Sequence, residues 1–180
     1  MTAYRATMKR PLLTRIARQI LRLTGCASVV GLLLWSHAPL AEAQTSVRVL
    51  PSGDRLELVN DAPDGGYSMT LPLYRSGDIR YFCAGVGLEE RQADYPPFPL
   101  KIILVAEGGA YLTHVAVTIR DESGARSIDI PKERVTGPWV FVDLPPGTYN
   151  LSAVRDGDTQ ERTHFKILPN STRTLYFRWP

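Results

Sequence analysis

The fold class is decided by residues 139–154, WVFVDLPPGTYNLSAV. After the Pro-Pro-Gly turn, Tyr149, Leu151 and Ala153 alternate with polar residues, and this period of two is typical of a strand with one buried face. Before the turn, WVFVDL has almost no polar face, so this strand is expected to be covered on both sides or to carry a partner-binding face. We interpret the stretch as the central hairpin of an antiparallel β-sandwich, because Pro-Gly favours a tight turn between two strands.

Residues 1–43 have the three parts of a secretory signal peptide. A basic region precedes an apolar run, Leu23 to Trp35, which is shorter than the ~20 residues needed to span a bilayer. Cleavage is expected after Ala43, which ends a small-x-small motif. The alternatives are an uncleaved anchor helix and lipidation at Cys26, which is disfavoured because the apolar run follows that cysteine. We expect a periplasmic or secreted protein with no transmembrane anchor after cleavage.

The formal charge of +3 comes from the leader. Residues 1–43 hold six of the 21 basic residues and one of the 18 acidic ones, so the remainder is slightly acidic. This leaves no global electrostatic case for nucleic-acid binding. The remainder has one cysteine, Cys83, which excludes an intramolecular disulfide. Its apolar neighbours predict a buried, unreactive thiol, with an intermolecular bridge as the alternative.

Short apolar runs separated by Gly, Pro and Asp predict an all-β protein. Residues 44–99 are expected to form an N-terminal β-rich extension that either adds strands to the sandwich or stands apart, and residues 100–180 a seven-stranded antiparallel β-sandwich. In the extension we expect strands at 46–50, 55–59, 69–74 and 79–84, a helical turn at 88–93 and an extended segment at 95–99. In the sandwich we expect strands at 100–106, 113–120, 126–130, 139–144, 148–154, 159–167 and 172–179.

The last two strands are expected to pair with each other. Apolar residues alternate along both, and matching their buried faces sets His164 opposite Tyr176. Their polar side chains would then share one outer face, the candidate binding face. It consists of Arg162, His164, Lys166, Tyr176 and Arg178. Such a cationic and aromatic surface fits an anionic glycan, a lipid headgroup or an acidic partner, and an ordinary solvated face is the alternative.

Four motifs between residues 109 and 149 go together. They are Gly109-Ala-Tyr-Leu112, Val115-x-Val-x-Ile119-x-Asp121-x-x-Gly124, Gly137-Pro-Trp139 and Asp143-Leu-Pro-Pro-Gly-Thr-Tyr149. With them the chain resembles the carboxypeptidase regulatory-like domain family over residues 100–180. The resemblance implies a transthyretin-like (prealbumin-like) β-sandwich and an accessory domain without catalytic residues. Residues 82–91 and 100–105 are also similar to small exported bacterial proteins that carry this domain.

No catalytic, cofactor-binding or metal-binding constellation is expected. The histidines outside the leader, His114 and His164, lack metallopeptidase spacing and are expected to point outward. Asp156-Gly-Asp158 is interpreted as a turn rather than a calcium loop. We therefore predict a non-catalytic binding or accessory module of the bacterial envelope, whose partner is an envelope protein or a glycan. A carbohydrate-binding module and a small hydrolase of the transthyretin-like fold are the alternatives, and the oligomeric state is left open.

Overall fold

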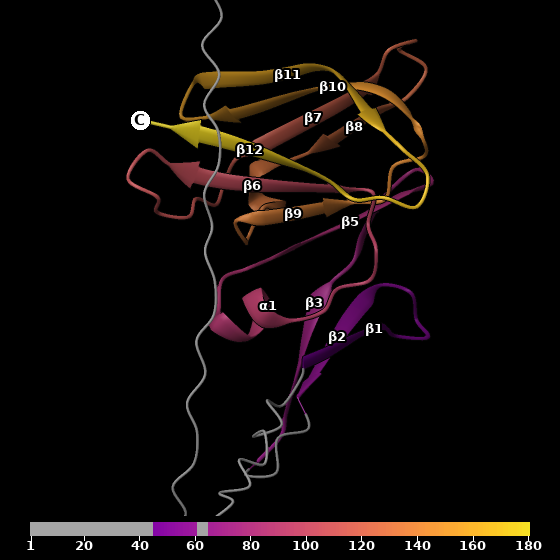
Figure 1. The fold of residues 1–180 in the computed structure, drawn as a ribbon, viewed down its shortest axis with the longest axis vertical. Helices are drawn as coiled ribbons and strands as arrows, with labels where there is room; N and C mark the ends of the chain where they lie inside the picture. The colour runs from indigo at the N-terminus through magenta and orange to yellow at the C-terminus, as the bar shows by residue number, and fades with distance from the viewer. Residues whose placement is uncertain (1–44, 61–64) are drawn as a thin grey trace, which may run out of the picture. The chain divides into compact units, whose positions relative to one another are not determined.

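The computed structural model describes residues 45–60 and 65–180 of the 180-residue chain (Figure 1). The predicted signal peptide and its cleavage site lie outside the described residues. The described part contains twelve strands, one short α-helix and one 3-10 turn. In chain order they are β1 (Thr45–Val49), β2 (Arg55–Asn60), β3 (Tyr67–Pro72), β4 (Tyr74–Ser76), β5 (Ile79–Ala84), α1 (Leu88–Gln92), β6 (Leu100–Ala106), β7 (Ala116–Asp121), β8 (Ser127–Ile130), η1 (Lys132–Arg134), β9 (Trp139–Val142), β10 (Gly147–Arg155), β11 (Asp158–Ile167) and β12 (Arg173–Trp179).

The strands form three sheets, stacked as layers (Figure 1). Four strands form one sheet in the order β11-β10-β7-β8, and five form the central sheet in the order β12-β6-β9-β5-β4. A first core lies between these two sheets and takes apolar side chains from both, such as Leu151 and Ile102. The third sheet, β1-β2-β3, packs on the other side of the central sheet, where Leu58 and Phe141 belong to a second core. The central sheet therefore buries side chains on both of its faces.

Strand β9 occupies the middle of the central sheet. It pairs with β5 on one side and with β6 on the other, and both pairings are antiparallel. Val140 and Val142 point into the first core, while Phe141 points into the second. There its ring stacks on that of Phe82, with ring centroids 4.6 Å apart. Residues 140–142 are therefore covered on both sides, one of the two alternatives expected for the WVFVDL run.

The interpretation of residues 139–154 as a hairpin is wrong. Strands β9 and β10 belong to different sheets, so the chain crosses between layers at the Pro-Pro-Gly turn. Pro145 and Pro146 have no N–H groups with which to extend a ladder. Tyr149 Oη donates a hydrogen bond to the Pro145 carbonyl oxygen at 2.8 Å, which fixes this corner. The buried residues of β10 are those expected: Tyr149, Leu151 and Ala153.

The expected pairing of the last two strands is also wrong. Strand β11 is an edge of the four-stranded sheet, whereas β12 is an edge of the central sheet and runs parallel to β6. Alternation of apolar residues along two strands does not show that they share a sheet. Instead, Arg162 Nη2 donates a hydrogen bond to the Tyr176 carbonyl oxygen at 2.9 Å. The Gln160 amide bonds both the N–H and the carbonyl oxygen of Arg178, so side chains of β11 satisfy backbone groups at the β12 edge that would otherwise invite another strand.

The all-β prediction is confirmed, and neighbouring strands are antiparallel except for β12 and β6. The finer expectation of a seven-stranded transthyretin-like sandwich is not confirmed, because the described residues hold twelve strands in three sheets. Strands β6 to β12 account for the seven expected after residue 100, but β4 and β5 complete the central sheet. Strand β5 fits there because Tyr81 and Cys83 enter the first core while Phe82 and Ala84 enter the second. The domain boundary at residue 99 stays a prediction.

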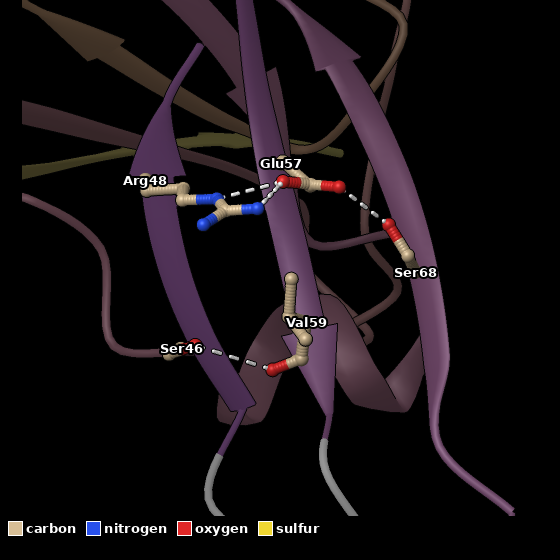
Figure 2. A network of polar contacts seen from close by, with 5 residues as sticks. All are labelled: Ser46, Arg48, Glu57, Val59 and Ser68. Carbon is tan, nitrogen blue, oxygen red and sulfur yellow. Dashed lines mark hydrogen bonds and ion pairs between the residues drawn. The ribbon is translucent and has the colours of Figure 1, made fainter.

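The strands expected at 46–50 and 55–59 are present as β1 and β2, which pair with each other in antiparallel fashion. On the outer face of this sheet, Glu57 accepts hydrogen bonds from Arg48 Nε at 2.7 Å and from Ser68 Oγ at 2.9 Å (Figure 2). One carboxylate thus joins all three strands. The helical turn expected at 88–93 is present as α1. None of the helices in the described ranges is long and apolar enough to cross a membrane.

Candidate functional site

The structure distributes the candidate binding face over two sheets. Lys166 is exposed and lies opposite Thr148 in the four-stranded sheet. Arg162 turns toward the gap between the sheets, where its guanidinium carbon lies 4.9 Å from the centre of the Phe177 ring. His164 is exposed at an irregularity of β11. The two remaining members, Tyr176 and Arg178, are exposed at the β12 edge of the central sheet, on the face opposite the first core, which we name its outer face.

A surface of aromatic and cationic side chains lies on that outer face. The register places Tyr176 beside Ile103, and Ile103 beside Trp139, so these residues form one row across β12, β6 and β9. Tyr111 reaches the same region through a bridge to Val105. Tyr176 and Tyr111 are 56% and 45% exposed, which is unusual for large rings in a row of a sheet. We name this surface the aromatic patch; it consists of Arg91, Lys101, Tyr111, Trp139, Tyr176 and Arg178.

Trp139 is the centre of the aromatic patch. Lys101 Nζ, from β6, lies 3.5 Å from the centre of the Trp139 ring. Gly85, which follows β5, is so close that a β-carbon there would lie 2.8 Å from Trp139 Cδ2. The Tyr111 ring meets the indole edge-on with centroids 6.5 Å apart, and the Arg91 guanidinium carbon lies 5.5 Å from the Tyr111 ring centre. Cations are attracted to aromatic faces, so these side chains order one another.

A buried carboxylate shapes the loop beside Trp139. Glu90 is 7% exposed, and its Oε2 accepts hydrogen bonds from the N–H groups of Gly85 at 2.7 Å and Val86 at 3.1 Å. A buried carboxylate requires such donors. Gly85 has φ +94°, a conformation that favours glycine. Glu90 therefore positions the loop that contacts the indole.

Lys101 is a half-buried cation that forms no ion pair with any acid in residues 45–60 and 65–180. Burial lowers the pKa of its ammonium group, because the side chain loses hydration that favours the charged form. Strands β6, β9 and β12, which support the aromatic patch, contain no Asp or Glu. An anionic group brought by a ligand would stabilise the charged form of Lys101.

Sequence reasoning named Tyr176 and Arg178 but missed the centre of the patch. It did not name Trp139 as a site residue, because the WVFVDL run has almost no polar face. The available signal was the alternation around Lys101, whose neighbours Leu100 and Ile102 are both buried. That alternation places Lys101 on the outer face, but only the pairing of β6 with β9 brings it to Trp139.

The two histidines do not converge. His114 precedes β7, and its Nδ1 lies 2.9 Å from Thr113 Oγ1. His164 lies at the other end, where its Nε2 is 3.7 Å from Oε1 of Glu122, just after β7. The length of β7 separates them by roughly 20 Å at ~3.3 Å per residue. In the part of the chain that the structure describes, no group of three or more His, Cys, Asp or Glu could hold a metal ion.

Cys83 is buried, as predicted. Its Sγ donates a hydrogen bond to the Arg134 carbonyl oxygen at 3.4 Å. Burial raises the pKa of the thiol to about 12, because the thiolate would lose its hydration. The thiolate is the nucleophilic form, so Cys83 is a core residue rather than a reactive group at neutral pH.

Comparisons with known proteins give no relative for this chain. No family model, no curated protein and no solved structure matches it. The inference of function therefore rests on the surface chemistry of the chain itself, and the aromatic patch is its most distinctive part.

Proposed function

We propose that the chain is an exported, non-catalytic binding module that holds an acidic segment of an envelope protein on the aromatic patch. The observation that carries the proposal is the row Tyr176–Ile103–Trp139, which has an aromatic ring at each end, with Lys101 over the indole. Aromatic residues and arginine are the side chains most enriched at the energetic centres of protein interfaces. The patch presents both.

The charge of the patch selects an acidic partner. Arg91, Lys101 and Arg178 are its only charged members, and the three supporting strands contain no acids. A carboxylate from the partner would stabilise the charged form of Lys101 in particular, because burial disfavours that form. Complementary charge speeds association and rejects basic partners. An Asp- or Glu-containing segment with an apolar residue is the chemistry that matches both components of the surface.

A protein segment is favoured here over a sugar, because sugars stack on free aromatic faces. The indole of Trp139 is flanked by Gly85 on the β5 side and by Lys101 on the β6 side. Its two neighbours thus occupy the space in which a pyranose ring would stack. The resemblance to the carboxypeptidase regulatory-like family, which implies an accessory domain, supports a role that assists another envelope component.

Export belongs to the same proposal. It rests on the signal-peptide pattern of residues 1–43. The test is the intact mass of the chain recovered from the periplasm of an expressing bacterium. The expected mass is that of a protein beginning at Gln44, whereas full-length protein held in the membrane would contradict the export proposal.

Site-specific photo-crosslinking tests the binding role. A photoreactive phenylalanine analogue replaces Tyr176, and in a separate variant it replaces the exposed Thr159 of β11 as the control. In living cells we expect one discrete protein adduct from position 176 and none from position 159. Adding Lys101→Glu and Arg178→Glu should abolish the adduct. Equal adducts from both positions, or an adduct that survives the charge reversal, would overturn the proposal.

A further inference from the structure

A second concave surface lies on the outer face of the four-stranded sheet, at a β-bulge. Tyr149 pairs with Phe165 and Leu151 pairs with Arg162, so two residues of β11 oppose the single residue Asn150 of β10. Bulges bend a strand and re-aim its side chains, and they are over-represented beside binding sites. This bulge is the one irregularity in the register of β10 with β11.

The bulge holds an uncommon backbone conformation. His164 has φ +53°, in the left-handed region that non-glycine residues rarely adopt. Its N–H donates a hydrogen bond to Asn150 Oδ1 at 2.9 Å. One side chain of the neighbouring strand thus holds the strained residue in place. Strain of this kind persists only where the surroundings enforce it, and it clusters at functional sites.

A cavity of about 280 Å³ opens at the bulge. Its polar lining consists of Thr118, Arg120, Asn150, Ser152, Glu161 and Thr163. The register explains why they meet: Glu161, Ser152 and Thr118 form one row across β11, β10 and β7, and the next row contains Asn150 and Arg120. The volume lies just below the ~300 Å³ at which pockets for drug-sized ligands begin. It suits one small ring rather than a long ligand.

The lining mixes donors and acceptors and carries one charge of each sign. Arg120 offers only donors, Glu161 only acceptors, and the hydroxyl and amide groups offer both. Thr118 Oγ1 donates to Asp129 Oδ1 at 2.7 Å, so this oxygen can act toward a ligand only as an acceptor. Neither Arg120 nor Glu161 forms an ion pair within the described ranges. An anion would meet Glu161 and a cation would meet Arg120, whereas a neutral hydroxyl is both donor and acceptor and matches every member.

We propose that this cavity binds a single pyranose unit of a neutral saccharide. The site is separate from the aromatic patch, because it belongs to the other sheet and faces away from it. It gives the module a second specificity beyond its protein partner, namely for a polyhydroxylated glycan. The lining contains no aromatic ring, so the sugar is held by hydrogen bonds to its hydroxyl groups rather than by stacking.

The test is a titration of the ¹⁵N-labelled mature chain with neutral methyl glycosides of glucose, galactose, mannose and N-acetylglucosamine, followed by amide chemical shifts. Glucuronate and glucosamine serve as the anionic and cationic probes. We expect at least one neutral glycoside to shift amides of 118–120, 150–152 and 161–164, and to bind at least tenfold more tightly than either charged sugar. No shift with any neutral glycoside, or tighter binding of a charged sugar, would overturn the proposal.

Variants separate this site from the patch. Arg120→Ala and Glu161→Ala alter exposed side chains, so the fold is expected to survive, and each should weaken sugar binding at least tenfold. Tyr176→Ala in the aromatic patch should leave sugar binding unchanged. If Tyr176→Ala abolishes sugar binding while Arg120→Ala does not, the sugar site is misplaced and the inference fails, whatever the outcome for the protein partner.

Discussion

Gly137 lies so close to Ala84 that a β-carbon on Gly137 would come 2.5 Å from the Ala84 carbonyl oxygen. The neighbouring atoms belong to the backbone of β5, which is fixed by its pairing with β9 and cannot give way. We predict that Gly137→Ala lowers the free energy of unfolding by about 1–3 kcal/mol, the usual cost of forcing extra atoms into a packed interior. Urea denaturation of the mature chain measures this. Gly108 is the control, because a β-carbon there meets nothing within 4 Å, and an equal loss in Gly108→Ala would contradict the packing argument.

The thiol of Cys83 should be inert in the folded protein. With its pKa raised to about 12 by burial, it stays protonated at pH 8, and the core also shields it. We predict that a thiol reagent modifies the folded mature chain at least tenfold more slowly than the same chain in denaturant, where the thiol is exposed. The colour released by an aromatic disulfide reagent measures the rate. The thiol ionises more readily in the unfolded chain than in the folded one. The free energy of unfolding should therefore also fall as pH rises above 9 toward 12. Fast modification of the folded chain would show that Cys83 is accessible.

The pKa of Lys101 should report occupation of the aromatic patch. Burial lowers this pKa below its usual value of 10.5, so the folded state disfavours the proton. The stability that Lys101 contributes is therefore present above pH 10.5 and is lost as pH falls through the lowered pKa. We predict that an NMR titration of the Lys101 ε-carbon gives a lower pKa in the folded chain than in urea. An acidic peptide bound at the patch should raise the folded value. An identical pKa in both states would mean that Lys101 is hydrated.

The Glu57 carboxylate should titrate below its usual range. The Arg48 hydrogen bond is the main cause of its lowered pKa, followed by the Ser68 hydroxyl (Figure 2). The contribution of this network to stability is therefore present above pH 4.5 and is lost as pH falls through the lowered pKa. We predict that Arg48→Ala raises the pKa of Glu57, as measured by carboxyl NMR. Ser46→Ala is the control, because Ser46 lies on the same strand but donates to the Val59 carbonyl oxygen; an equal rise in both variants would contradict the assignment to Arg48.

Local patterns in the sequence predicted individual strands well. The strands at Ile79–Ala84 and Leu100–Ala106 have the predicted bounds, because apolar runs between Gly and Pro residues determine where a strand begins and ends. The alternation of Tyr149, Leu151 and Ala153 predicted the buried face of β10 for the same local reason. The turn at Asp156-Gly157 could be predicted because both residue types tolerate a positive φ, and both residues have a positive φ in the structure.

Which strands become neighbours could not be predicted in the same way. A Pro-Pro-Gly turn can join two strands of one sheet or strands of two different sheets. Only the burial of both faces of β9 shows that this turn joins two sheets. The bulge opposite Asn150 has no local signature in the sequence, so the side of the sheet on which Arg162 lies was predicted wrongly. The aromatic patch depends on Lys101, Tyr111 and Trp139 meeting across β6, β9 and the loop after β6, and such meetings follow from topology rather than from spacing.

The parallel pairing of β12 with β6 has a consequence for how this protein is made. Strand β12 comes last among the strands in chain order, yet it supplies Leu175, Phe177 and Trp179 to the first core and lies beside a strand made some seventy positions earlier. A growing polypeptide therefore cannot close its main core until synthesis has passed Trp179. The order of its strands therefore delays the completion of this core to the end of β12.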